Sequence, residues 1–303
     1  MTEAVDALKV YLVGFKANLV TALFLDNAAI QEINLQGVIY VGRSGSLLAV
    51  ATRLFLKGRV NATRAMLITN WWPPVPAVDA VSTDDGQLEA ILREKGDAVF
   101  IVCGCDRILR AAHLSQGKFV NFHNSILPGN RGVAAIKWSK FNGQPVGFTF
   151  HTMAVEIDKG EVLYQHAVAQ DLQARGFPVL SELLATRAAQ VLPHLIEILQ
   201  GLRSSVRFKK EVSSSYHSKA DTEHATRVLK DMASSELIEK IVFAFEELRL
   251  VNESGDVLRL APVHVRRPAG VWGKLFRQID LLGAEIFLPV WLVKRARGFS
   301  CRR

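Results

Sequence analysis

Two polar side chains stand one residue apart in the middle of the chain, within the stretch FVNFHNSILPGNRG. They are Asn121 and His123, and on an extended strand both side chains would point to the same face. A histidine titrates near neutral pH, and an asparagine amide can hold a carbonyl oxygen while it becomes an oxyanion. The pair predicts carbonyl chemistry. On its own it also fits a turn-capping Asn121 and an interior His123.

A carboxylate farther along the chain adds weight to the catalytic interpretation. Asp158 stands at an expected turn before Gly160, 158 − 123 = 35 residues after His123. A carboxylate beside an imidazole orients the ring and favours its charged form. Asn121, His123 and Asp158 thus form a candidate trio, and we interpret His151 as a structural histidine at a strand end.

Alternating strands and helices are expected to position these residues. Strand-like runs are predicted at 8–14, 37–42, 65–71, 97–104 and 117–124. Helices are predicted at 18–33, 85–96, 181–202 and 235–248. This alternation predicts an α/β fold with a Rossmann-like, mostly parallel sheet and helices on both faces.

The composition changes after about residue 205. Residues 207–224 are polar, Ser-rich and charged, which is typical of a linker or crossover. We expect a catalytic domain at 1–205 and a smaller C-terminal α+β region at 206–303. Residues 264–303 hold nine Lys and Arg and two acidic residues, so this basic amphipathic tail is a candidate for a homodimer contact or a membrane-surface contact.

Composition limits the function classes. The chain has 303 residues, 49% of them hydrophobic, and a net charge of +8, which indicates a globular protein with a full core. Its start lacks a basic region followed by an apolar core, so a cytoplasmic protein is expected, with the tail as a candidate contact to the inner membrane face. Three cysteines cannot supply a four-ligand zinc site, and no metal is expected.

Residues 121–165 resemble the 10-formyltetrahydrofolate-dependent formyltransferases, which include glycinamide ribonucleotide, methionyl-tRNA and sugar N-formyltransferases. The family pattern has Asn-x-His, a Ser-(Leu or Ile)-Leu-Pro loop, Arg-Gly, Trp, Gly-x-Thr and Asp-x-Gly in this order. The chain matches it at Asn121, His123, Ser125, Leu127, Pro128, Arg131, Gly132, Trp138, Gly147, Thr149, His151, Asp158 and Gly160.

The resemblance implies a co-substrate and roles for residues. A primary amine would attack the formyl carbon of 10-formyltetrahydrofolate, Asn121 and His123 would stabilise the oxyanion, and Asp158 would orient His123. The stretch 97–109 looks like the strand and turn that line the pterin site. The implied folate contacts are Gly104, Arg107, Ile108, Leu109 and Ile157.

Departures from the family pattern bear on the acceptor. The turn GFKANL at 14–19 lacks the Gly- and Ser-rich sequence that brings backbone N–H groups onto a phosphate, which disfavours the purine enzymes. Residues 42–58 lack the Lys- and Arg-rich insertion of the tRNA enzymes. We therefore expect a small amine, a nucleotide-linked amino sugar, with Trp71 and Trp72 as stacking surfaces. The alternatives are a methionyl-tRNA formyltransferase, a formyltetrahydrofolate hydrolase and a non-catalytic binding protein.

Overall fold

The structure is a computed structural model, and it describes most of the chain. The described residues are 8–42, 46–56, 58–80, 85–105, 107–229, 235–246, 248–251, 257–260, 264–266, 276–281 and 284–289.

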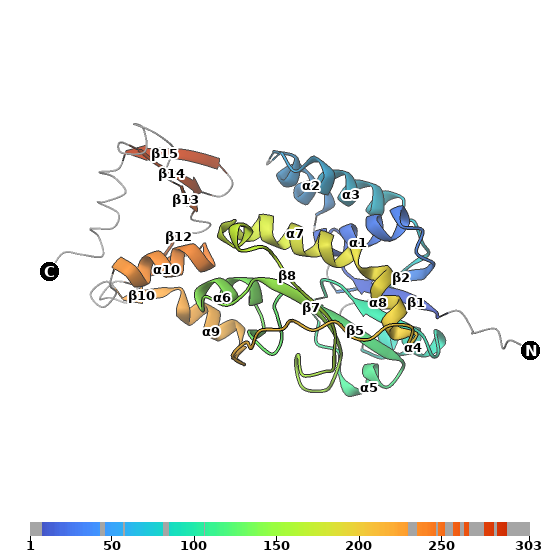
Figure 1. Ribbon diagram of the computed structural model, residues 1–303. Coiled ribbons are helices and arrows are strands. Elements are labelled where there is room, and N and C mark those ends of the chain that lie inside the picture. The colour runs from blue at the N-terminus through green and yellow to red at the C-terminus, as the bar shows by residue number, and fades with distance from the viewer. Residues whose placement is uncertain are drawn as a thin grey trace, which may run out of the picture.

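A seven-stranded sheet forms the centre of the molecule, in the order β3-β2-β1-β4-β5-β7-β8 (Figure 1). The strands from β3 to β5 in this order are parallel, while β7 and β8 join antiparallel. Their bounds are β1 (Val10–Gly14), β2 (Leu35–Val41), β3 (Ala77–Ala80), β4 (Val99–Val102), β5 (Lys118–His123), β7 (Gly147–Thr152) and β8 (Val162–Ala167). The predicted mostly parallel α/β sheet is confirmed.

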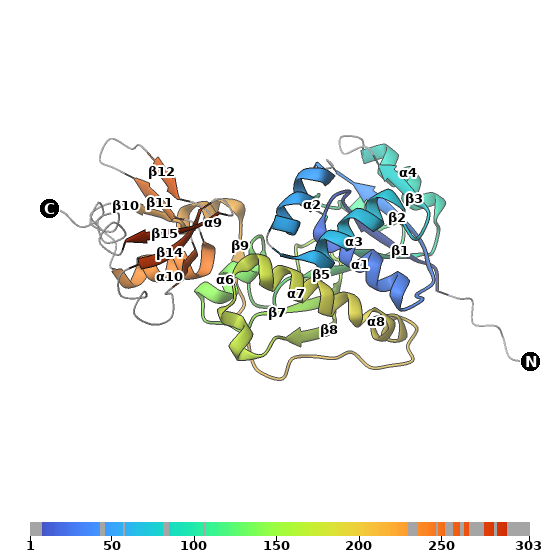
Figure 2. The ribbon, with the colours of Figure 1, turned by 90° about the horizontal axis from the view of Figure 1, so that it is seen from above.

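Helices cover both faces of this sheet (Figures 1 and 2). Successive residues of β1 point to opposite faces, so Leu12 joins the apolar cluster under one helical layer and Val13 joins the cluster on the other side. The first layer contains α1 (Leu19–Ile30), α7 (Phe177–Gln190) and α8 (Leu192–Leu199). The opposite face carries α4 (Asp85–Glu94) and α5 (Ala111–Leu114).

The strand predicted at 65–71 is wrong, because these residues belong to the helix α3 (Val60–Trp71). The buried side chains Ala62, Ala65, Met66 and Thr69 recur at the helical spacing of three and four residues. Thr69 also donates its hydroxyl hydrogen to the carbonyl of Ala65 at 2.7 Å, a contact typical of a polar residue inside a helix. A further helix, α2 (Leu47–Leu56), lies between the second strand and α3.

The single helix predicted at 181–202 is two helices, because α7 ends at Gln190 and α8 begins at Leu192. Pro193 stands at the start of α8, where its missing N–H and its ring interrupt the hydrogen-bond ladder of the preceding helix. The 3-10 helix η1 (Gln170–Ala174) precedes α7.

The polar segment 207–224 contains more structure than a linker. It includes the strand β9 (Tyr216–His217), which pairs in parallel with β6 (Arg131–Gly132), and the first residues of α9 (Lys219–Ala225). Upstream of β9, Val206 bridges to Tyr164 of β8. The domain boundary near residue 205 stays a prediction.

The C-terminal region is joined to the sheet domain through α6 (Ala135–Phe141) and α10 (Ser235–Phe245). Trp138 of α6 shares an apolar cluster with Ile241 and Phe245 of α10. The remaining strands are β10 (Arg227–Leu229), β11 (Leu248–Val251), β12 (Val257–Leu260), β13 (His264–Arg266), β14 (Phe276–Leu281) and β15 (Ala284–Pro289). Much of the predicted basic tail, including Trp272 and Trp291, lies outside the described residues.

Candidate active site

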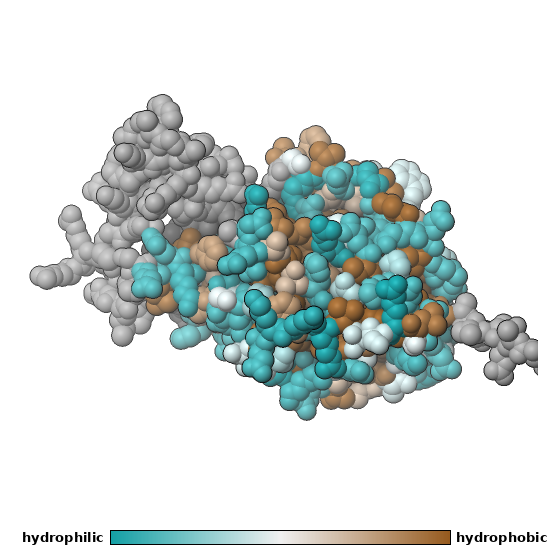
Figure 3. All heavy atoms as spheres, viewed as in Figure 1, coloured by the Kyte–Doolittle hydropathy of each residue, from teal (hydrophilic) through white to brown (hydrophobic). Residues whose placement is uncertain are grey.

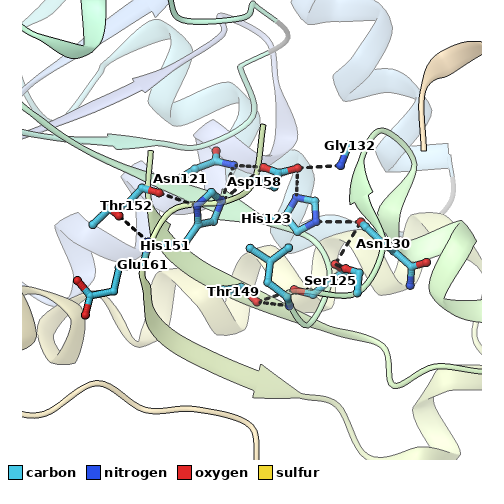
Figure 4. A network of polar contacts seen from close by, with 12 residues as sticks. Asn121, His123, Ser125, Asn130, Gly132, Thr149, His151, Thr152, Asp158 and Glu161 are labelled. Carbon is cyan, nitrogen blue, oxygen red and sulfur yellow. Dashed lines mark hydrogen bonds and ion pairs between the residues drawn. The ribbon is translucent and has the colours of Figure 1, made fainter. Parts of the chain in front are cut away.

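The end of β5 and the neighbouring strand β7 present their polar side chains on one face (Figure 4). Asn121 and His123 are two residues apart on β5, as predicted from their spacing. The antiparallel register places His151 of β7 directly opposite Asn121. Directly opposed residues of paired strands lie close on the same face. His151 is therefore a fourth member of the polar group, beside the three residues predicted from the sequence.

Asp158 reaches this face from the loop between β7 and β8. Its carboxylate lies 3.5 Å from His123 Nδ1 and 3.5 Å from His151 Nε2, and it accepts a hydrogen bond from the backbone N–H of Gly132 at 2.8 Å. The backbone of Asp158 has a left-handed φ of 53°. The structure thus brings Asn121, His123 and Asp158 together, and their catalytic roles stay predictions.

A tight turn holds Asp158 in place. A Cβ atom at Gly160 would lie 1.5 Å from the carbonyl oxygen of Thr152, so only glycine fits there without a shift of the backbone. The hydroxyl of Thr152 accepts a hydrogen bond from the Glu161 N–H at 2.8 Å on the other side of the turn. The loop is therefore closed directly behind the carboxylate.

His123 is buried, and burial lowers the pKa of its imidazole from the ordinary value. The nearby charge of Asp158 and the backbone carbonyl of Asn130 act in the opposite direction. His123 Nε2 lies 3.1 Å from that carbonyl oxygen, which can only accept, so Nε2 carries a proton. A second proton on Nδ1 would face the Asp158 carboxylate.

The pKa of Asp158 is lowered to about 2, although burial alone would raise it. A hydrogen bond with His151, the charge of His123 and the Gly132 N–H all favour the carboxylate. Asp158 is therefore ionised at neutral pH, and it acts as a fixed negative charge between two imidazole rings.

His151 controls the orientation of Asn121. Its Nδ1 lies 2.7 Å from the carbonyl oxygen of Thr152, which can only accept, so Nδ1 carries a proton and Nε2 faces Asn121 and Asp158. The Asn121 amide nitrogen lies 3.3 Å from this Nε2 and 3.5 Å from Asp158 Oδ1. In the sequence, the alternation of Thr149 and His151 could have indicated that both side chains share one face of a strand. It could not show that this strand pairs with the strand of Asn121.

A segment from the C-terminal side of the chain supports the loop next to His123. Asn130 N donates to Ser215 Oγ at 3.1 Å, and Arg131 N donates to the Ser215 carbonyl at 2.9 Å. Val133 N donates to the His217 carbonyl at 3.0 Å. The loop that supplies the Asn130 carbonyl to His123 thus forms a short strand pair. Its partner strand lies more than eighty residues away in sequence.

The Asn130 side chain is buried at the centre of this support. It bonds to Ser139 at 3.1 Å, to Asn142 at 2.9 Å and to Ser215 at 3.2 Å, and it also bonds to Gln144. Beside it, the ring of His217 stacks on Trp138 with 3.7 Å between centroids and 6° between planes. Stacking and hydrogen bonding together fix the position of the loop.

The predicted folate contacts lie at the end of β4 and in the loop after β7. Gly104 has a φ of 80°, and a Cβ there would lie 2.7 Å from Asn18 Oδ1. Leu109 is buried in an apolar cluster on which Met153 packs, which brings the two predicted loops together. Ile108 and Ile157 are exposed, and Arg107 is partly buried. Across the described residues, no group of three or more His, Cys, Asp or Glu is arranged to hold a metal ion.

The sequence model of the family described as "Formyl transferase" matches residues 54–174. These residues thus match a formyl transferase domain. This confirms the resemblance predicted from residues 121–165, and the matched residues include Asn121, His123 and Asp158.

Curated relatives of this domain include the methionyl-tRNA formyltransferase of Pelotomaculum thermopropionicum. It is 29% identical over 136 residues, which are 44% of this chain and 43% of the relative. The chain thus spans less than half the length of that relative.

Solved structures show the same fold over more of the chain. A sugar N-formyltransferase from Shewanella sp. aligns with a TM-score of 0.60 at 16% identity, over 84% of this chain and 96% of that protein. An N-formyltransferase from Helicobacter canadensis, in complex with folinic acid and dTDP-3-aminofucose, aligns with a TM-score of 0.52 at 17% identity, over 93% and 99%.

Proposed function

We propose that the protein transfers the formyl group of 10-formyltetrahydrofolate to a primary amine. The observation that carries this proposal is the convergence of Asn121, His123 and Asp158 on one face of the sheet, inside the formyl transferase domain. An amide donor, a buried imidazole and an ionised carboxylate are the groups that an acyl transfer through an oxyanion requires.

The amine nitrogen attacks the formyl carbon, and the carbonyl electron pair moves onto the formyl oxygen. Asn121 donates an N–H to this oxygen, in exchange for its 3.5 Å contact with Asp158. That contact is at the limit of hydrogen bonding, so little is lost when the amide turns to the substrate. The stabilisation is therefore larger in the transition state than in the resting enzyme.

The proton that the amine loses passes through the Asp158 carboxylate to Nδ1 of His123, which lies 3.5 Å from it. Burial lowers the pKa of His123, so the ring is neutral at pH 7 and can accept a proton, and the resulting imidazolium lies between Asp158 and the Asn130 carbonyl. This cation stabilises the neighbouring oxyanion. When the carbon–N10 bond breaks, the proton passes to N10 as it takes the electron pair, and His123 returns to the neutral form.

Folate is assigned to the surface between the loop at 104–109 and the loop at 153–158. The exposed apolar side chains of Ile108, Val155 and Ile157 supply the flat contact surface that a pterin ring prefers. The related protein from Helicobacter canadensis was crystallised with folinic acid, which supports the same class of co-substrate here.

The acceptor is proposed to be a nucleotide-linked amino sugar. The sugar N-formyltransferase and the protein bound to dTDP-3-aminofucose share this fold over most of the chain, and these likenesses support the acceptor class. The curated relatives named methionyl-tRNA formyltransferase make the tRNA the second acceptor to test.

The test is an acceptor panel with 10-formyltetrahydrofolate as donor. Free tetrahydrofolate and formate are followed with nucleotide-linked amino sugars, with initiator methionyl-tRNA, and without acceptor. Saturable tetrahydrofolate release with one amino sugar, and no formate, is the expected result. If methionyl-tRNA is formylated, and this activity falls steeply as salt rises, the acceptor is the tRNA and not an amino sugar. Formate release without acceptor would show a hydrolase, and tetrahydrofolate release in none of the three would contradict catalysis.

A further inference from the structure

The two helices that follow β2 expose an apolar surface at the edge of the molecule. In Figure 3, brown spheres stand out at the upper rim, where Figure 1 places α2. The side chains concerned are 57–78% exposed, and they gather on two helices that pack against each other, whereas single exposed apolar residues scattered over a surface are common. The hairpin surface, as it is called below, consists of Leu48, Phe55, Leu56, Val60, Trp71 and Trp72.

The hairpin surface is held firmly by the fold. α2 turns into α3 at Gly58, whose N–H donates to the Phe55 carbonyl at 2.8 Å and whose φ is 68°. The guanidinium of Arg59 then pairs with Glu182 and donates to the Pro178 carbonyl at 2.7 Å, both on α7. The two helices bury Leu54, Met66 and several alanines on their inner sides. The exposed side chains are therefore presented by ordered helices.

The same stretch of chain carries only positive charge. From residue 33 to residue 78 there is no Asp or Glu, and there are five basic residues, Arg43, Arg53, Lys57, Arg59 and Arg64. Of these, Arg59 and Arg64 pair with Glu182 and Asp26, while Arg53 is exposed on α2. The apolar side chains thus lie within a segment that attracts anions.

We propose that the hairpin surface docks on an anionic lipid bilayer. Protruding leucine, phenylalanine and tryptophan side chains beside arginines are the combination that inserts into the headgroup region. Indole rings prefer this depth in particular. Among the described residues no helix is long and apolar enough to cross a membrane, and the hairpin would lie on the surface.

Other occupants fit less well. In a symmetric contact between two copies, the same surface meets itself, so the exposed Arg53 of each copy would enter the same interface. A nucleic acid or a nucleotide would use the rings of Trp71 and Trp72 for stacking, but it gains nothing from protruding aliphatic side chains such as Leu48, Leu56 and Val60. A deformable, anionic and apolar partner matches both the charge and the side-chain types.

The experiment measures co-sedimentation of the full chain with vesicles. Vesicles of equimolar phosphatidylcholine and phosphatidylglycerol are compared with phosphatidylcholine alone. We expect binding to the anionic vesicles that weakens with salt, and a loss of about tenfold or more in Phe55→Ser/Leu56→Ser, since two apolar side chains would no longer be buried in the headgroup region. The control variant Ile30→Ser/Leu202→Ser removes two equally exposed apolar residues elsewhere and should bind within about twofold of the parent.

A second measurement follows tryptophan emission. Anionic vesicles should shift it to the blue, brominated lipids should quench it, and Trp71→Phe/Trp72→Phe should remove most of this response. Vesicle binding that survives Phe55→Ser/Leu56→Ser unchanged would place the lipid contact elsewhere, on the basic tail for instance, and would overturn the proposal. Absence of binding, with a self-association or RNA affinity that this variant abolishes, would overturn it in favour of a second copy or a nucleic acid.

Discussion

The face around Asp158 and the α2–α3 hairpin depart from the usual distribution of side chains in opposite directions. At the first, His123, His151 and Asn130 are buried, and each has hydrogen-bond partners. At the second, leucines and tryptophans are exposed on ordered helices. Buried polar groups are costly unless they are paired, and exposed apolar groups forgo the gain of burial. The two proposals account for these departures in different ways, the first region by chemistry within the protein and the second by contact with a lipid surface.

The largest effect is expected at the centre of the polar region. His123→Ala should lower turnover by about 10²–10³-fold, because it removes the proton carrier and the cation beside the oxyanion. Tetrahydrofolate release in the presence of the acceptor measures this. The control His224→Ala removes an exposed histidine on α9 and should turn over like the parent. A His123→Ala enzyme within about threefold of the parent would end the catalytic assignment.

The next effect concerns the turn behind Asp158. Gly160→Ala places a methyl group against the Thr152 carbonyl and should destabilise the fold by about 1–3 kcal/mol. It should also displace the carboxylate, with about 10²-fold lower turnover. Denaturant unfolding and turnover are measured on the same sample. The control Gly96→Ala stands at a left-handed turn with open space around it, so it should lose stability and keep turnover. Equal turnover in both variants would show that the turn does not position Asp158.

A smaller effect should follow from loosening the support of the loop. Ser215→Ala removes the hydroxyl that bonds to the Asn130 N–H and side chain, and it should cost about 1 kcal/mol of stability. Because the Asn130 carbonyl opposes the fall in the pKa of His123, a displaced loop should lower that pKa further and move the pH profile of kcat. The neighbouring exposed Ser214→Ala is the control. If the pH profile of kcat is the same in Ser215→Ala and in the parent, the contact of Ser215 with Asn130 has a structural role only.

The smallest effect is expected at the hairpin surface. Phe55→Ser/Leu56→Ser should change the free energy of unfolding by no more than about 0.5 kcal/mol per site, because both side chains are exposed. Turnover with a water-soluble acceptor should match the parent. Urea unfolding of the two proteins side by side is the measurement. A large loss of stability would mean that these side chains pack inside the protein, and the contrast between the two regions would disappear.

The features of the site that depend on neighbouring residues could be predicted from the sequence. The i, i+2 spacing of Asn121 and His123 predicted their common face because a strand repeats every two residues. Asp158, 158 − 123 = 35 residues after His123, was added as a carboxylate at an expected turn before Gly160, and the resemblance implied the roles of the three residues. The register that sets His151 against Asn121 depends on strand pairing, which no local pattern encodes.

Other parts were missed for related physical reasons. Ser215 lies 85 residues from Asn130, so its contact follows from tertiary folding alone. The helix α3 was mistaken for a strand because a short apolar run fits a helix and a strand equally well. The spacing of its buried residues, which identifies the helix, is known only from the structure. The hairpin surface could not be predicted, since the sequence does not show which side of an apolar helix stays uncovered.

The pairing of β6 with β9 also has a consequence for the growing chain. Once residues 1–205 have left the ribosome, every strand of the main sheet and every member of the trio is present. The N–H groups of Asn130, Arg131 and Val133 still lack their partners at that moment, because these belong to Ser215 and His217. N-terminal parts fold first during synthesis, so the sheet can form before the loop at 130–133 gains these hydrogen bonds. A nascent chain would acquire its fold before its activity, and translation past residue 217 would be the step that completes the enzyme.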